Sequence, residues 1–183
     1  MKHLFFRLFT MMVMMAALVS CSCMKGSGKY DTHKAACDSL YQHGWDSVSI
    51  GIFRKFCVKR ISRLDPVAEI DSNATVIAGF KVMDKSRKLS KDHQAVLKFL
   101  LRNPDSYAKN KNRVKTIFAP YLALELSDNK YLLIGFNSDE WAVASKDSVI
   151  SVREYTCKRQ LLRLGMEIYP DDKYLKAISE TVK

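Results

Sequence analysis

Histidine is scarce in this sequence, and so are the motifs that bind metals. The chain holds four histidines in 183 residues, and it contains no His-x-x-x-His or Cys-x-x-Cys pair. His33 and Cys37 lie four residues apart on an expected helix, but a site with nitrogen and sulfur ligands needs three or four of them to converge. We therefore predict that the protein uses no metal and no cofactor.

Glycine is also rare, with seven residues, and the glycine motifs of common enzymes are missing. The absence of Gly-x-Ser-x-Gly argues against the usual serine hydrolases. No glycine-rich phosphate loop follows an expected strand, which argues against nucleotide binding. The adjacent acids at 139–140 and 171–172 are typical of solvated turns, although paired carboxylates also cleave glycosides. We assign no catalytic residue from the sequence.

No apolar run reaches the ~20 residues that a membrane-spanning helix needs. The longest one lies at the N-terminus, where Lys2 and Arg7 are followed by an apolar stretch that ends at Ser20. A short basic region, an apolar segment of about a dozen residues and small residues before a cleavage site are typical of a secretory signal peptide. We predict that residues 1–20 form such a signal.

The end of this segment is more specific. The residues Leu18, Val19, Ser20 and Cys21 stand directly after the apolar segment, and they resemble the lipobox of bacterial lipoproteins. The resemblance implies that Cys21 becomes the N-terminus and carries a diacylglyceryl group on its sulfur and an acyl chain on its amine. Several acyl chains together give a stable membrane anchor. The alternative is an ordinary signal peptide, with Cys21 in a disulfide.

The residues after Cys21 predict a tether and one folded domain. Lysine, glycine and serine follow in Met24-Lys25-Gly26-Ser27-Gly28-Lys29, and glycine and serine make flexible linkers. We therefore divide the chain into a signal peptide (1–20), a lipidated cysteine with its tether (21–30) and a single domain (31–183), which has the size of one ordinary domain.

The chain is basic, with a formal charge of +11. Removing residues 1–20 takes away two of the 30 basic residues and none of the 19 acidic ones, so the charge falls to +9. Basic charge favours anionic partners. These charges are spread in short groups, however, which is typical of solvated faces. Because an exported chain rarely meets nucleic acid, we predict that nucleic acid is not a partner.

Four cysteines remain once Cys21 is assigned to lipid: Cys23, Cys37, Cys57 and Cys157. Four cysteines allow three pairings in an oxidising compartment. A domain of this size does not need disulfides, and Cys57 and Cys157 stand among apolar neighbours, which is typical of buried thiols. The sequence does not decide between disulfides and free thiols.

The pattern of apolar residues predicts an α+β domain, with an antiparallel sheet of five or six strands and helices packed on one face. Ser90 is a good N-cap for the clearest helix, in which Val96, Leu97, Leu100 and Leu101 form one apolar stripe. Closely spaced strands joined by short turns then predict an antiparallel meander. Helices are expected at 31–43, 90–102, 152–166 and 171–182, and strands within 47–66 and at 76–84, 114–120, 122–127, 131–136 and 140–145.

Residues 89–145 carry a second resemblance. The segment at 91–107, the sequence Phe118-Ala119-Pro120 and the sequence YLLIGFNSDEWAV at 131–143 resemble a group of small, poorly characterised bacterial lipoproteins of the kind found in Bacteroidetes. Where that group has Cys-Phe-x-Cys, this chain has Gly135-Phe136-Asn137-Ser138, so a redox or metal role of the cysteine pair does not transfer. The resemblance implies a fold and a location, but it implies no activity.

Phe136 and Trp141 are the aromatic residues of this segment that bear on function. They predict either an aromatic binding surface or cross-strand contacts within the sheet. An exposed aromatic patch would indicate a binding protein. Burial of both side chains would make them part of the core.

The leading functional hypothesis is a non-catalytic lipoprotein that binds or supports another envelope component, either a protein or a glycan. Ser22 follows Cys21, and in the lipoproteins that this sequence resembles, a residue other than Asp there implies the outer membrane. We expect the domain to face the periplasm, and surface display stays open. The alternatives are an envelope hydrolase and a periplasmic inhibitor or immunity protein, whose basic charge would suit an acidic target.

Overall fold

The computed structural model describes residues 45–54, 57–108, 116–126 and 129–182. The signal peptide, Cys21, the tether, the helix expected at 31–43 and the pair His33 and Cys37 lie outside the described residues. In chain order, the elements are α2 Ser47–Arg54, β1 Arg60–Asp65, β2 Val76–Ile77, β3 Phe80–Val82, β4 Arg87–Lys88, α3 Lys91–Arg102, a 3₁₀ turn Pro104–Ser106, β5 Leu122–Glu125, β6 Lys130–Gly135, β7 Glu140–Ser145, β8 Val149–Glu154, α4 Lys158–Ile168 and α5 Lys173–Thr181.

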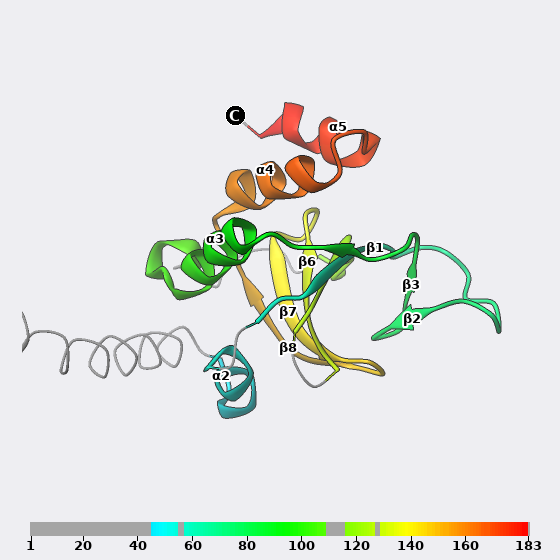
Figure 1. The fold of residues 1–183 in the computed structure, drawn as a ribbon, viewed down its shortest axis with the longest axis horizontal. Coiled ribbons are helices and arrows are strands. Elements are labelled where there is room, and N and C mark those ends of the chain that lie inside the picture. The colour runs from blue at the N-terminus through cyan, green and yellow to red at the C-terminus, as the bar shows by residue number, and fades with distance from the viewer. Residues whose placement is uncertain (1–44, 55–56, 109–115, 127–128, 183) are drawn as a thin grey trace, which may run out of the picture. The chain divides into compact units, whose positions relative to one another are not determined.

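The fold is α+β and is built on an antiparallel sheet (Figure 1). The strands lie in the order β2-β3-β1-β5-β6-β7-β8, and β4 pairs with β1 beside this path. The described residues therefore contribute eight strands to the sheet, and the expected count of five or six was wrong. The strands β2, β3 and β4 are two or three residues long, too short for the period of two that reveals a strand.

Side chains from the four described helices join one core with one face of the sheet. This core contains Phe53 of α2, Leu97 of α3, Leu161 of α4 and Leu175 of α5. Strands β5 to β7 contribute Leu122, Leu124, Leu132, Ile134 and Val143 to it. Helices α4 and α5 lie together at the top of Figure 1. The described helices thus pack on one face of the sheet, in agreement with the expected arrangement, and none of them is long and apolar enough to cross a membrane.

The opposite face of the sheet carries smaller side chains. Its core consists of Leu64, Ala123, Leu133, Ala142 and Ala144, with the β2–β3 hairpin packed over them. At the tip of the hairpin, Ala78 and Gly79 have φ of 52° and 85°, as a tight two-residue hairpin turn requires. The Ala78 amide donates to the carbonyl of Lys146 over 2.6 Å. The sheet is therefore curled, so that its first hairpin reaches the turn between β7 and β8.

Three segments differ from their predicted type. Residues 47–54 were expected to be a strand, but they form helix α2. The Asp46 carboxylate caps the first turn of this helix by accepting from the Ser49 amide over 2.8 Å. The helix at 152–166 begins only at Lys158, because residues 152–154 complete strand β8. The described part of the segment 114–120 lies in no strand. In each case a short apolar run fitted two periods, and the tertiary contacts decided between them.

Helix α3 begins as predicted, with the Ser90 hydroxyl accepting from the His93 amide over 3.1 Å. Leu97, Leu100 and Leu101 are buried, whereas Val96 is exposed. The apolar stripe is thus narrower than its sequence pattern. We expect Leu100→Ala to lower the free energy of unfolding by about 2–5 kcal/mol, because it removes buried methyl groups and leaves a cavity.

The control for this prediction is Lys98→Ala, on the exposed side of the same helix. A surface change of this kind stays within about 0.5 kcal/mol. Urea unfolding of the three proteins measures both effects. Similar losses for the two variants would show that the buried side of α3 is wrongly assigned.

Candidate functional site

Phe136 and Trp141 do not form a surface. Both side chains have no exposed area, and they lie in the core beneath the helices. The Trp141 ring packs against Tyr107 and Tyr155, with centroids 5.1 and 5.6 Å away. The predicted aromatic binding surface is therefore wrong, and these residues are cross-strand core. Strand alternation explains the burial of Trp141, which shares the helix-covered face of β7 with Val143.

The other reactive side chains lie apart from one another. Burial raises the pKa of the Cys157 thiol to about 11, so this thiol stays protonated at neutral pH. Cys57, expected to be buried, is exposed, and both are free cysteines. His93 lies 3.4 Å from Glu167 between α3 and α4. Within the described part of the chain, no three His, Cys, Asp or Glu side chains are grouped as metal ligands.

A cavity of about 500 Å³ opens on the face of the sheet that carries no helices. Its walls come from strands β1, β2, β3, β5 and β6, from Thr75 just before β2, and from the segment between β3 and β4. The apolar part of the wall consists of Ile77, Val82, Met83 and Ala123, and the polar part consists of Ser62, Thr75, Asp84, Lys85, Ser86, Glu125 and Tyr131. This volume lies within the usual range of ligand sites, about 300–1,000 Å³.

Strand alternation brings these side chains to one face. Along β5, Leu122 and Leu124 point into the helix-covered core, whereas Ala123 and Glu125 line the cavity. The neighbouring strand β1 places Ser62 opposite Ala123. The cavity exists because the side chains of Ser62 and Ala123 are small. Larger residues at these positions would fill the space over the sheet.

Glu125 and Tyr131 are direct partners in the register of β5 and β6, and both line the cavity half-buried. Burial raises the pKa of Tyr131, and the negative charge of Glu125 raises it further. A phenol beside a carboxylate therefore stays protonated at neutral pH. The pair presents one acceptor group and one hydroxyl to the cavity.

Most polar side chains in the cavity wall have no partner among the described residues. In the described residues, the side chains of Ser62, Thr75, Lys85, Glu125 and Tyr131 make no hydrogen bond or ion pair. Ser86 accepts from the Arg60 guanidinium over 3.1 Å, and Asp84 binds Arg63. Thr75 and Lys85 are exposed, and Glu125 and Tyr131 are half-buried, so their hydrogen-bonding groups are open to water or to a ligand.

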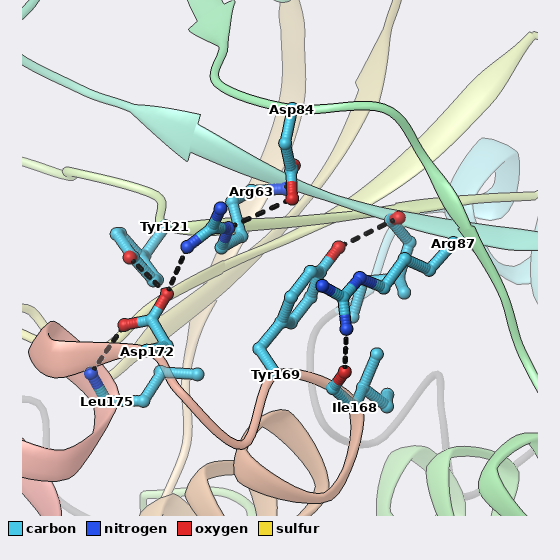
Figure 2. Close-up of polar contacts among 9 residues, drawn as sticks. Arg63, Asp84, Arg87, Tyr121, Ile168, Tyr169, Asp172 and Leu175 are labelled. Carbon is cyan, nitrogen blue, oxygen red and sulfur yellow. Dashed lines mark hydrogen bonds and ion pairs between the residues drawn. The ribbon is translucent and has the colours of Figure 1, made fainter.

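A second polar cluster lies behind the cavity, on the helix side of the sheet (Figure 2). Its centre is Arg63 of β1, which donates through Nε to Asp84 over 3.1 Å and through Nη1 to Asp172 over 2.8 Å. Asp172 also accepts from the Tyr121 hydroxyl over 2.7 Å and, through its other oxygen, from the Leu175 amide over 3.0 Å. Asp172 is thereby both an ion-pair partner and the N-cap of α5.

The charges of this cluster stabilise each other. Burial acts to raise the pKa of Asp172, but the hydrogen bonds from Arg63, Leu175 and Tyr121 outweigh it, and the pKa lies below its ordinary value of 3.8. The hydrogen bond to Asp172 raises the pKa of Arg63. Beside them, the Arg87 guanidinium lies 4.4 Å from the centroid of the Tyr169 ring, whose hydroxyl donates to the carbonyl of Ile61 over 3.1 Å.

The two clusters have different roles. In the Arg63 cluster the carboxylates and the guanidinium are already paired, and the contacts join β1 to the turn between α4 and α5. This arrangement attaches the C-terminal helices to the sheet. In the cavity, five polar side chains are unpaired within the described chain. The cavity is therefore the candidate binding site, with Asp84 in contact with both regions.

Sequence patterns did not reveal this site. Its residues come from positions 62 to 131, and none of them belongs to a recognised catalytic or ligand-binding motif. One signal was present, since Glu125 interrupts an otherwise apolar strand that runs Leu122-Ala123-Leu124. A search among family models, curated proteins and solved structures finds no match to this chain.

Proposed function

We propose that this protein is a lipid-anchored, non-catalytic binding component of the bacterial cell envelope. The observation that supports binding is the cavity on the helix-free face, in which polar side chains from three strands and two connecting segments make no hydrogen bond or ion pair with other described side chains. The proposed anchor is Cys21 in its lipobox, and the proposed location is the outer membrane, with the domain facing the periplasm. The tether at 21–30 would then let the cavity reach ligands near the membrane.

Binding fits the cavity better than glycoside hydrolysis does. Hydrolysis of a glycoside uses two carboxyl groups on either side of the scissile bond. The cavity is lined by the carboxylates of Asp84 and Glu125. Asp84 accepts from both the backbone amide and the Nε of Arg63, so its carboxylate is already engaged in an ion pair. Glu125 is left as a single unpaired carboxylate, which suits recognition of a ligand rather than its cleavage.

The anchor is tested by mass spectrometry of protein taken from the membranes of the native cell. We expect an N-terminal peptide that begins at an acylated Cys21 and no peptide from residues 1–20. Cys21→Ala should block acylation and cleavage at this site. Cys23→Ala is the matched control, two residues away, and should be acylated as the wild type is. A soluble mature chain with an unmodified N-terminus would contradict the proposed location.

A further inference from the structure

The cavity wall carries charges of both signs. Asp84 is already engaged, because it accepts hydrogen bonds from the backbone amide and the Nε of Arg63, which also binds Asp172. Of the charged groups that line the wall, Lys85 and Glu125 remain, one of each sign. Arg60 is paired with Glu125 in the β1–β5 register, but its guanidinium donates to Ser86 at the rim. A ligand with a large net charge of either sign would therefore gain little binding affinity from electrostatic contacts in this cavity.

The unpaired groups suit hydroxyl groups on a ligand. The side chains of Ser62, Thr75 and Tyr131 each carry a hydroxyl, which can donate one hydrogen bond and accept others. The Glu125 carboxylate only accepts and the Lys85 ammonium only donates. A molecule with several hydroxyl groups around one ring supplies donors and acceptors in all directions, as this mixed wall requires.

The remaining wall is apolar. Ile77, Val82 and Ala123 line the cavity beside the half-buried ring of Tyr131. Sugar rings carry C–H groups on their faces and hydroxyl groups at their edges, so they combine apolar contact with hydrogen bonding. An aromatic side chain with a polar tip offers the same combination on the side of the protein. The cavity of about 500 Å³ is large enough for such a ring.

We infer that the cavity binds a neutral, polyhydroxylated ligand, namely a sugar residue. Glu125 accepts hydrogen bonds from its hydroxyl groups, and the ring of Tyr131 packs against its face. This inference rests on the proposed binding function and adds the chemical class of the ligand. The residues that select it are Ser62, Thr75, Lys85, Glu125 and Tyr131.

Titration of the full chain, purified from membranes in a mild detergent, with single sugars tests the inference. The neutral probes are glucose, galactose, mannose and N-acetylglucosamine, and the charged probes are glucosamine and glucuronate, which differ from glucose at one substituent. Saturation-transfer NMR reports contact, and calorimetry reports affinity. We expect at least one neutral sugar to bind, and we expect it to bind more tightly than either charged sugar.

Substitutions show whether binding occurs in this cavity. Glu125→Gln should weaken binding of the neutral sugar about tenfold or more, because the charged acceptor of its hydroxyl hydrogen bonds becomes a neutral amide that also carries donors. Tyr131→Leu should remove the ring contact, whereas Tyr131→Phe should retain it. The matched control is Glu154→Gln, a half-buried glutamate of β8 outside the cavity. Thr75→Val should also weaken sugar binding. Because Thr75 is exposed, this variant tests the inference if Glu125→Gln fails to fold.

The outcomes separate this inference from the proposed function. Binding of a neutral sugar that is weakened by Glu125→Gln and not by Glu154→Gln supports it. Binding of glucosamine or glucuronate alone, with the same dependence on Glu125, overturns the ligand class and leaves the binding function in place. Absence of binding by all six probes also overturns the ligand class. Sugar binding that none of the cavity substitutions changes overturns the site itself.

Discussion

Replacing Trp141 with alanine should lower the free energy of unfolding by about 3–5 kcal/mol, as the loss of a large buried aromatic side chain does. Trp141 has no exposed area and lies among Trp45, Tyr107 and Tyr155, with ring centroids 5.1 to 6.5 Å away. Its removal would leave a void between β7 and the helix layer that these rigid rings cannot fill. Urea unfolding of wild type and variant, with the slope compared as well as the midpoint, measures the loss.

Phe99→Ala is the control for Trp141→Ala. Phe99 is also aromatic, but 65% of it is exposed on α3, so its removal should change the free energy of unfolding little. Trp141→Phe should lower the free energy of unfolding by less than Trp141→Ala does. The Trp141 indole nitrogen is buried without a hydrogen-bond partner in the described chain, and phenylalanine removes this unsatisfied donor along with part of the ring. Equal stability of wild type and Trp141→Ala would contradict the burial and would favour the aromatic surface.

The second large effect is expected for Asp172→Ala, which should lower the free energy of unfolding by about 3–5 kcal/mol. Removal of one partner from a buried ion pair leaves the other charge uncompensated. Here the side chain of Asp172 is 2% exposed and that of Arg63 is 26% exposed, and Arg63 keeps Asp84 as a partner, so we expect the lower end of this range from the ion pair. The loss of the N-cap of α5 adds about 1 kcal/mol.

The control is the adjacent residue. Asp171→Ala changes an exposed carboxylate in the same turn and should stay within about 0.5 kcal/mol of wild type. Circular dichroism during urea unfolding measures both variants. If Asp171→Ala proved as damaging as Asp172→Ala, the effect would come from the turn in general and not from the contacts with Arg63, Tyr121 and Leu175.

The effect of Asp172 should also depend on pH. Its pKa in the folded protein lies below the ordinary value of 3.8, because the hydrogen bonds from Arg63, Leu175 and Tyr121 outweigh the opposing effect of burial. The stabilisation from its ionised form is therefore fully present above pH 3.8 and is lost as the pH falls through the folded-state pKa. The difference in stability between wild type and Asp172→Asn should be largest at neutral pH and should shrink in acid. A difference that grows in acid would contradict the ion pair.

Where the sequence carried a long and regular pattern, it predicted the local structure. Ser90 and the spacing of Leu97, Leu100 and Leu101 were enough for α3, because capping and a 3.6-residue period are local properties. The meander of β5, β6 and β7 was predicted for the same reason, since short turns join its strands. The α+β class and the helix layer followed from these elements.

Short segments were decided by tertiary contacts. In residues 47–54, Val48, Ile50 and Ile52 alternate with small residues as in a strand, yet the segment is helix α2. As a helix, it buries Ile50 and Phe53 in the core and exposes Val48. The packing of Phe53 against Trp45, with centroids 5.1 Å apart, depends on a core that the local pattern does not encode. The two- and three-residue strands β2, β3 and β4 exist only because they pair with β1 or with each other.

The sequence by itself determined the N-terminal pattern around Cys21, the absence of common catalytic motifs, the class of the fold and the boundaries of helix α3. Only the tertiary structure decided that Phe136 and Trp141 are core, that Arg63 meets Asp172 across 109 positions, and that Ser62, Glu125 and Tyr131 share one cavity. The physical reason is the range of the interactions. Capping and periodicity act within a few residues of the chain, whereas burial, ion pairing and a cavity depend on side chains that meet only after the sheet has formed.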